Sequence, residues 1–261
     1  MSGPLLVDRT DGVVTVTMNR PDSLNSLDVA LKVALRDTFL ELATDPGCRA
    51  VVLAGAGRAF CVGQDLREHL AALATKAPLD TVSEHYNPMV AALAALPVPV
   101  VAAVRGAAAG AGAGLAFLAD FRIGGPSTSY LMAFARVGLA ADSAVSWTLP
   151  RLIGHAKATE LLLLAEPVKS EQAHHLGLLT RLLDSDDEVL PAAQKLAARL
   201  AAGPTVAYAQ IKRELFEGAT GTLADALAVE LAAQTVAGGT TDHREATNAF
   251  VEKRTPRFEG R

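Results

Sequence analysis

The stretch that decides the fold is Arg105-Gly106-Ala107-Ala108-Ala109-Gly110-Ala111-Gly112-Ala113-Gly114, in which four glycines and five alanines occupy ten positions. An apolar, β-branched run over residues 98–104 precedes it, and a helical pattern over 115–119 follows it. A turn of small residues between a strand and a helix leaves unpaired backbone N–H groups at the helix start, and it lets a ligand approach the backbone closely. We therefore predict that this turn holds the carbonyl oxygen of a substrate.

Composition excludes several function classes. The 261 residues suffice for a large core, and the net charge of -4 without a basic stripe argues against nucleic-acid binding. Two cysteines, Cys48 and Cys61, indicate neither a disulfide framework nor a metal site, and they favour a reducing compartment. The N-terminus lacks a secretory pattern, and no apolar run approaches the roughly 20 residues of a membrane span. We expect a cytoplasmic protein that contacts no membrane.

The order of predicted elements indicates an α/β core followed by helices alone. Strands over 5–8 and 13–18 form a hairpin around Asp11-Gly12. A helix is expected over 28–43 and strands over 49–54, 98–104, 121–123 and 178–183. Residues 129–137 read as irregular or extended, and 67–95 as mixed helix with a break near Ala77-Pro78. Helices are expected over 142–153, 156–165, 171–176, 188–201, 204–216, 222–236 and 242–254.

Sequence signals also predict how two of the last helices begin. Thr222 with Asp225, and Asp242 with Glu245, have the spacing of an N-terminal capping box. Such a box satisfies two of the backbone donors that a helix start leaves unpaired. We therefore place the starts of these helices at Thr222 and Asp242.

Two loops that leave short buried strands are candidate parts of one site. They contain Val62-Gly63-Gln64 and Gly110-Ala111-Gly112. If neighbouring strands carry them, both lie at the sheet edge where α/β folds bind ligands. Gln64 and Ala111 would then each offer one N–H to a common point. Such a pair stabilises an oxyanion, and losing one donor costs about 3–4 kcal/mol of barrier. Glycine-rich turns are also common as purely structural elements, and composition leaves both readings open.

An oxyanion hole needs an acid or base opposite it, and the chain offers few candidates. Asp142 lies where a loop enters a helix. The residues alone favour a helix N-cap at Asp142 or Ser143 over catalysis. No Ser–His–Asp order and no metal-ligand spacing is legible. The other candidates have other expected roles. Asp65 is expected to fix the shape of its loop, and Asp120 to have a structural role. Glu84 and His85 could line a pocket wall, and His174 and His175 are expected to face solvent.

Five segments together resemble the enoyl-CoA hydratase/isomerase family, also called the crotonase superfamily. They cover residues 19–27, 57–66, 97–120, 149–154 and 249–254, so the resemblance spans nearly the whole chain. It implies an α/β spiral of ββα units with a C-terminal helical trimerisation region. On that basis residues 1–200 form the acyl-CoA-binding core and residues 201–261 the oligomerisation region. A homotrimer or a dimer of trimers is expected.

The resemblance also implies acyl-CoA thioester substrates and no cofactor beyond the coenzyme A of the substrate. The thioester oxygen would be held by the N–H groups of Gln64 and Ala111. Phe250 and Lys253 would reach the nucleotide end of coenzyme A, in a neighbouring subunit, although Lys253 also fits an ordinary solvated helix face. The other implied substrate and coenzyme A contacts are Arg20, Asn25, Ser26, Leu27, Ala59, Cys61, Asp65, Leu66, Gly110 and Phe134.

One departure from the family pattern bears on the reaction. Hydratases of the family place two glutamates opposite the hole, whereas this chain has Gly114 and Phe134 at those places. The remaining acid is Asp142. Its context over 133–151 is similar to a branch of ring-opening isomerases that act on 1,2-epoxyphenylacetyl-CoA, in which this aspartate is the acid/base. The resemblance therefore favours catalysis over capping, although Ala141 and Ala144 replace a proline and a glycine often seen there.

The predicted function is acyl-CoA isomerisation, in which a double bond shifts or a strained ring opens through a thioester enolate. Asp142 would move the proton, and burial would raise its pKa towards that of a useful base. One alternative is an enoyl-CoA hydratase that adds water held by Asp142 or by residues 67–95 to a 2-enoyl-CoA. The other is a non-catalytic acyl-CoA-binding protein. The acyl group stays open, because residues 67–88 are expected to shape its pocket.

Overall fold

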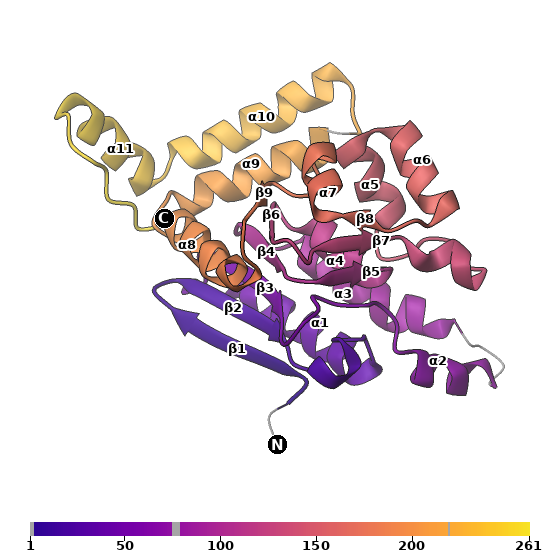
Figure 1. The fold of residues 1–261 in the computed structure, drawn as a ribbon. Coiled ribbons are helices and arrows are strands. Elements are labelled where there is room, and N and C mark those ends of the chain that lie inside the picture. Colours follow the sequence, from indigo (N-terminus) through magenta and orange to yellow (C-terminus); the bar gives the residue numbers. More distant parts are fainter. Residues whose placement is uncertain (1–2, 75–78, 219) are drawn as a thin grey trace.

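A mixed sheet forms the centre of the computed structural model, which describes residues 3–74, 79–218 and 220–261. The predicted break near Ala77-Pro78 lies outside these residues. The sheet has the order β1-β2-β3-β4-β6-β9, and it is parallel except for the β1–β2 hairpin (Figure 1). Its strands are β1 (Leu5–Thr10), β2 (Val13–Met18), β3 (Ala50–Gly55), β4 (Val100–Val104), β6 (Phe121–Gly124) and β9 (Arg181–Leu182).

Helices cover both faces of this sheet, so the protein has two hydrophobic cores, one on each face. Side chains alternate between the faces of a strand. In β3, Val51 and Leu53 pack towards α1 (Val29–Thr44) and α3 (Asn87–Ala94), whereas Val52 and Ala54 pack towards α8 (Val189–Ala201). The larger core also contains α4 (Ala111–Leu118) and α5 (Val145–Ile153). The near-continuous apolar strands follow from burial on both faces.

The small-residue stretch connects the main sheet to a second one. After β4 the chain turns at Gly106 and forms β5 (Ala107–Ala109), which pairs with β7 (Ser129–Leu131) and through it with β8 (Val168–Lys169). It then turns at Gly110 into α4. The prediction of strand, turn and helix is confirmed, with an extra short strand inside the turn. A Cβ on Gly112 would collide with the carbonyl of Cys61, so only glycine allows this close approach.

The remaining helices differ from the sequence expectation mainly at their ends. The segment over 129–137, expected to be irregular, contains β7 and a 3₁₀ helix, η3 (Ala133–Val137), and α5 begins three residues later than expected. None of the helices in the described part of the chain combines the length and apolarity needed to span a bilayer. The other elements are η1 (Pro21–Ser23), α2 (Leu66–Leu73), the π-helix η2 (Val82–Tyr86), α6 (His155–Leu164), α7 (Ser170–Leu176) and η4 (Asp186–Glu188).

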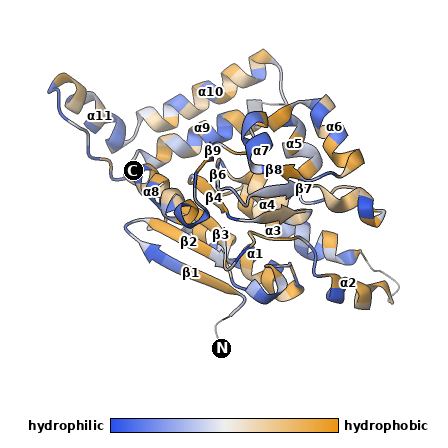
Figure 2. Ribbon diagram, in the orientation of Figure 1, coloured by the Kyte–Doolittle hydropathy of each residue, from blue (hydrophilic) through white to orange (hydrophobic). Residues whose placement is uncertain are grey.

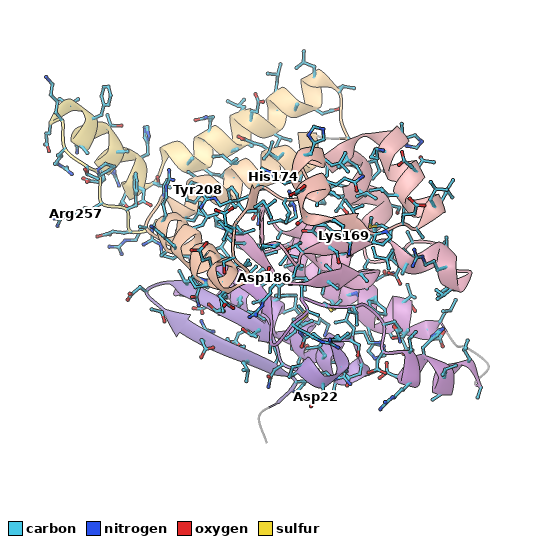
Figure 3. All side chains as sticks on the ribbon, in the orientation of Figure 1. Asp22, Lys169, His174, Asp186, Tyr208 and Arg257 are labelled. Carbon is cyan, nitrogen blue, oxygen red and sulfur yellow. The ribbon has the colours of Figure 1, made fainter. Side chains whose placement is uncertain are left out.

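The C-terminal helices α9 (Thr205–Gly218), α10 (Leu223–Gly238) and α11 (Thr241–Val251) form a layer at one side of the molecule (Figure 1). Lys212 ties α9 to the core, because its ammonium bonds the carboxylate of Asp120 at 2.8 Å and the carbonyl of Val98 at 2.8 Å. The structural role expected of Asp120 is therefore confirmed. His174 and His175, in the last turn of α7, face solvent as expected (His174 is labelled in Figure 3).

Of the two predicted capping boxes, one is confirmed and the other is wrong. The box of Thr222 and Asp225 is present at the start of α10. The prediction that Asp242 and Glu245 form a capping box is wrong, because Thr240 is the N-cap of α11. Asp242 is instead buried and accepts the N–H groups of Glu259 and Gly260 at 2.7 and 2.8 Å. The C-terminal tail, far along the chain from the helix start, decides the role of this aspartate.

Candidate active site

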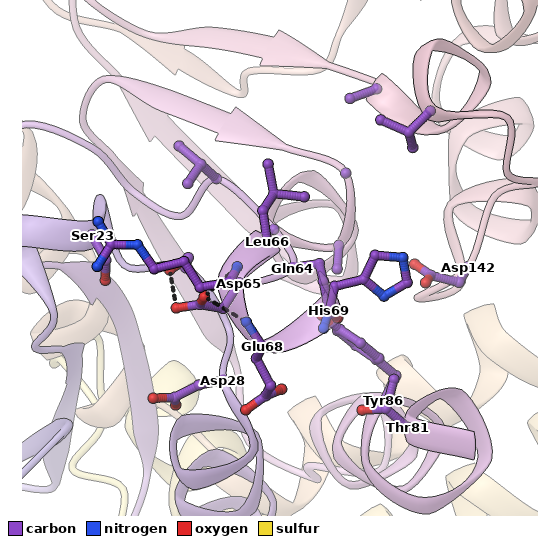
Figure 4. Close-up of a pocket in the computed structure, with 18 of the residues that line it drawn as sticks. Ser23, Asp28, Gln64, Asp65, Leu66, Glu68, His69, Thr81, Tyr86 and Asp142 are labelled. Atoms are coloured by element: carbon purple, nitrogen blue, oxygen red, sulfur yellow. Dashed lines mark hydrogen bonds between the residues drawn. The ribbon is translucent and has the colours of Figure 1, made fainter. Parts of the chain in front are cut away.

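A cavity of about 1230 Å³ opens beside the small-residue turn (Figure 4). Its wall combines the loop before α2, helix α2 itself, π-helix η2, the start of α4, and the chain from η3 to Asp142. Of the predicted site residues, Gln64, Ala111 and Asp142 all line it. The two loops and the acid, separated by up to 78 positions in sequence, therefore meet in one cavity, as predicted.

Gln64 and Ala111 each have a backbone N–H group at the lining of this cavity. The carbonyl of Gly63 accepts the N–H of Leu27 at 2.7 Å, and the carbonyl of Gly110 accepts the N–H of Gly114 at 3.2 Å. In a trans peptide the N–H points opposite the carbonyl, so the N–H groups of Gln64 and Ala111 turn away from these partners. Within the described residues neither group has a hydrogen-bond acceptor. Both are therefore free to bind a ligand oxygen.

Glycines make this orientation possible. Gly63 and Gly110, which precede the two donors, have φ values of 85° and 51°, in the region that favours glycine. A Cβ on Gly63 would lie 2.8 Å from the carbonyl oxygen of Ala109. The two loops are also joined directly, because the N–H of Ala109 bonds the carbonyl of Cys61 at 2.9 Å. The start of α4 adds the positive end of a helix dipole at Ala111.

Asp142 is partly buried, and it supplies a carboxyl group with one buried oxygen to the cavity. Its Oδ1 atom, like the hydroxyl of Ser143, is buried without a hydrogen-bond partner in the described residues. Burial raises the pKa of the Asp142 carboxyl above its ordinary value, although the charge of Lys32 opposes this. The capping interpretation is wrong, because Ala144 is the N-cap of α5 and no side chain caps it. Asp142 is thus free for chemistry.

The loop that carries Asp142 is strained. Ser143 and Ala144 have consecutive φ values of 51° and 60°, which are unfavourable for residues with a Cβ. Such positions cost on the order of 1–3 kcal/mol each and cluster at functional sites. These two left-handed residues turn the chain directly after Asp142, whose side chain lines the cavity.

Replacing Ala144 with glycine is therefore expected to stabilise the protein. A glycine at this position would adopt the left-handed conformation without a Cβ clash, and we expect the free energy of unfolding to rise by about 1 kcal/mol. Urea denaturation measures this change. Ala141→Gly is the matched control, because Ala141 does not have a positive φ, and that variant should be no more stable than the parent. Equal effects of the two substitutions would contradict the strain assigned to Ala144.

The resemblance places the two glutamates of hydratases at positions 114 and 134. In this structure neither position carries an acid, and the surroundings of Gly114 leave no room for a longer side chain. A Cβ on Gly114 would lie 2.5 Å from the carbonyl oxygen of Ser143 and 2.9 Å from its Cβ. The Asp142 loop therefore occupies the space that a longer side chain at 114 would need. Phe134, at the second place, is nearly buried and packs beside Gly110 in the cavity wall. Neither position can move a proton or hold a water by a carboxylate.

The other predicted contacts fall into three groups. Arg20, Ser26, Asp65, Leu66, Gly110 and Phe134 line the cavity. Asn25, Leu27, Ala59 and Cys61 do not, because they are buried behind its wall. Asn25 supports that wall, since its side-chain oxygen accepts the N–H of Arg20, which lines the cavity, at 2.9 Å. Phe250, on α11, and Lys253, which follows this helix, are exposed and do not line the cavity of this chain. Helix α11 lies at the opposite side of the molecule from α2 (Figure 1).

Arg20 and Asp65 form an ion-pair network at the cavity mouth. The Arg20 guanidinium lies 2.9 Å from the Asp65 carboxylate and 3.1 Å from that of Asp28. Asp65 also caps α2 through the N–H groups of Arg67 and Glu68. Burial alone would raise the pKa of Asp65, but these bonds hold it below its ordinary value. The prediction that Asp65 fixes the loop is confirmed, and the charge of Arg20 is balanced by two carboxylates.

Sequence reasoning missed three residues here. Tyr86 is buried, and its hydroxyl donates to the side-chain oxygen of Gln64. The ring of His69, on α2, extends towards Asp142 (Figure 4). Lys32 lies behind the wall and contacts the Tyr86 ring. A lysine between the core positions of α1 was the one legible signal, since residues 67–95 have no clear periodicity.

Glu84 and His85, expected to line the wall, do not line the cavity. The π-helix η2 presents Val82 and Tyr86 to the cavity instead, together with Thr81, which precedes it. Val82 and Tyr86 are four residues apart and therefore lie on one face of the helix, whereas Glu84 and His85 lie outside that face. The expectation for Glu84 and His85 is therefore wrong.

The α/β fold and the paired free amides beside one acid define a crotonase-type protein. The chain belongs to the enoyl-CoA hydratase/isomerase family, whose model matches residues 8–261. It is 41% identical to a 1,2-epoxyphenylacetyl-CoA isomerase of Escherichia coli K12 over 253 residues, which is 96% of each chain. A solved structure from Mycobacterium abscessus, assigned to the enoyl-CoA hydratase/isomerases, has a TM-score of 0.95 and 43% identity, and covers 98% of this chain and 100% of that one. An enoyl-CoA hydratase from Bacillus anthracis has a TM-score of 0.94 and 29% identity, with coverage of 99% and 100%.

Proposed function

We propose that the protein is an acyl-CoA isomerase that shifts a double bond or opens a strained ring, with Asp142 as its acid/base. The observation that carries this proposal is the state of the cavity carboxylates. Asp65 and Asp28 are paired with Arg20, and Glu68 with Lys32. Among the described residues that line the cavity, Asp142 has the buried carboxyl oxygen without a partner.

The chemistry follows from the two amides and the one acid. The N–H groups of Gln64 and Ala111 would bind the thioester oxygen and stabilise the negative charge that forms on it when a neighbouring carbon loses a proton. Asp142 would take that proton and return it to another carbon, so substrate and product have the same composition. Val62, Phe134 and Leu139 give the cavity an apolar lining that disfavours water. The named activity of the Escherichia coli relative supports the same reaction class.

Product analysis tests this function. The purified protein is incubated with a 3-enoyl-CoA, with crotonyl-CoA as a 2-enoyl-CoA, and with 1,2-epoxyphenylacetyl-CoA, and the products are identified by chromatography with mass spectrometry. A product of unchanged mass and new retention time is the expected result. A product heavier by one water from crotonyl-CoA as the main reaction would identify a hydratase. Binding without conversion of any of the three would identify a non-catalytic member.

We also propose that α9, α10 and α11 form the surface of a homotrimer or of a dimer of trimers. Apolar residues recur along these helices (orange segments of the ribbon in Figure 2). The following apolar residues are more than half exposed: Leu215, Phe216, Leu223, Leu227, Leu231, Phe250 and Val251. Such a patch typically marks a protein interface. In an assembly, Phe250 and Lys253 could reach the coenzyme A of a neighbour. Light scattering coupled to size-exclusion chromatography measures the assembly state, and a monomer would contradict the proposal.

A further inference from the structure

Lys32, on α1, is a lysine whose charged end is completely buried. Its side chain is 0% exposed. It follows the core residue Leu31 in α1 and precedes Leu35 by one turn. Lysine is almost never fully buried unless its charge is partnered, because removing an ammonium group from water is costly. The mechanism proposed above gives this residue no task, so its contacts decide what it can do.

The contacts of Lys32 join two separate segments of the cavity wall. Its Nζ atom lies 3.2 Å from the Oε1 atom of Glu68, donates to the Thr81 hydroxyl at 2.7 Å, and lies 4.7 Å from the centre of the Tyr86 ring. Glu68 belongs to α2, whereas Thr81 and Tyr86 stand at the two ends of η2. All three partners line the cavity (Figure 4). One ammonium group therefore links α2 to η2 from behind the wall.

The same contacts lead to one of the two oxyanion donors. The Tyr86 hydroxyl donates to the side-chain oxygen of Gln64, which lines the cavity and whose backbone N–H has no acceptor in the described residues. On the other side, the second oxygen of Glu68 accepts the N–H of Val29 at 2.8 Å, at the start of α1. The arrangement of α1, α2, η2 and the Gln64 loop thus depends on a connected set of bonds with Lys32 at its centre.

The charge of Lys32 also acts on the proposed acid. Its positive charge favours the ionised form of Asp142 and opposes the effect of burial. Among the described residues, His69 on α2 and Tyr86 at the end of η2 are the other titratable groups drawn near Asp142 in the cavity (Figure 4). Burial, together with the negative charge of Asp142, raises the pKa of Tyr86, which therefore stays a neutral donor at pH 7. Lys32 supplies the buried positive charge of this group.

We propose that Lys32 is a positioning residue of the isomerase, which holds α2, η2 and the Gln64 loop in place. This inference rests on the function proposed above. Lys32 does not line the cavity. It acts through Tyr86 on the oxyanion hole.

Lys32→Met tests the proposal, because it removes the charge and keeps most of the volume. The variant removes one partner of the ion pair and is expected to be less stable than the parent. It should still fold, because the Glu68 side chain left without its partner is 32% exposed and can be hydrated. We expect kcat to fall about tenfold or more through misplacement of the reacting groups, with little change in KM. The acidic limb of the kcat/KM profile should move to higher pH, whereas in Lys32→Arg it should stay in place. Lys195→Met, at an exposed position of α8, is the matched control and should match the parent. An unchanged kcat in Lys32→Met would overturn the proposal.

A second measurement needs no substrate. If Lys32 favours ionised Asp142, then Asp142→Asn should raise the melting temperature at pH 7 more in the Lys32→Met background than in the parent. Hydrogen exchange of the α2 amides should also be faster in Lys32→Met than in the parent. Equal stabilisation in both backgrounds together with unchanged exchange would overturn the Lys32 proposal. If the parent converts no acyl-CoA, the proposed function fails by itself, while these two measurements still decide whether Lys32 has this role.

Discussion

Asp142→Asn should lower kcat for the isomerisation by about 10²–10⁴-fold, the usual contribution of a positioned acid or base. The amide keeps the shape of the side chain but cannot accept a proton from carbon. Because the buried Oδ1 atom has no partner in the described residues, the substitution breaks no hydrogen bond to that atom, and the fold should persist. Steady-state kinetics on the substrate identified by product analysis measures the loss. Asp8→Asn, on the exposed strand β1, is the matched control for removal of one carboxylate and should leave kcat unchanged.

The pH dependence of the parent follows from the same residue. The base must be ionised to take a proton, so kcat/KM should rise with pH through the pKa of Asp142 and then level off. Burial raises this pKa, so kcat/KM should rise at a pH above the ordinary aspartate pKa of about 3.9. Asp142→Asn should lose this limb along with the rate. A variant that keeps most of its isomerase activity and the same limb would show that another group is the base.

Stability supplies an independent readout with a definite sign. Since the native pKa of Asp142 is raised, the native state keeps a proton that the unfolded chain has already lost in the interval between the two pKa values. Stability contributed by this group therefore falls as pH rises through that interval. Asp142→Asn removes the effect, so its advantage in melting temperature over the parent should grow with pH across the interval and then level off. A variant that is more stable and yet inactive is the expected combination.

Local patterns were sufficient to predict the parts of the fold that neighbours in sequence determine. The hairpin at Asp11-Gly12 and the turn from β4 into α4 follow from turn chemistry and apolar runs. Asp65 and Thr222 cap helices through residues within three positions. The prediction that Asp242 caps a helix failed, because its hydrogen-bond partners, Glu259 and Gly260, belong to the C-terminal tail.

The site shows the same division between local and distant causes. The residues around Gln64 and Ala111 suggest free amides, but which way each N–H points depends on bonds from Leu27 and within α4. Asp142 reads locally as a helix cap, and only the left-handed turn at Ser143 and Ala144 removes it from that role. The task of Lys32 depends on Glu68, Thr81 and Tyr86, which helical spacing in α1 does not reveal.

Ala111→Pro should be the other variant with a large loss, because it deletes one oxyanion donor without removing a side-chain function. Ala111 is the first residue of α4, a position where proline is well tolerated and where the N–H has no acceptor in the described residues. The preceding Gly110 has no Cβ to clash with the proline ring. Loss of one such donor typically lowers kcat by about 10²–10³-fold, equivalent to about 2.7–4 kcal/mol of barrier.

The control for this variant is Ala111→Gly, which keeps the N–H and changes the side chain by one methyl group. It should retain most of the parent activity, whereas Ala111→Pro should lose it while circular dichroism and thermal melting show a folded protein. Because the proline ring also occupies the space in front of the former N–H, the thioester oxygen cannot find a replacement donor there. A folded Ala111→Pro protein with activity within a few-fold of the parent would place the substrate oxygen elsewhere, and the pairing of Gln64 with Ala111 would have to be abandoned.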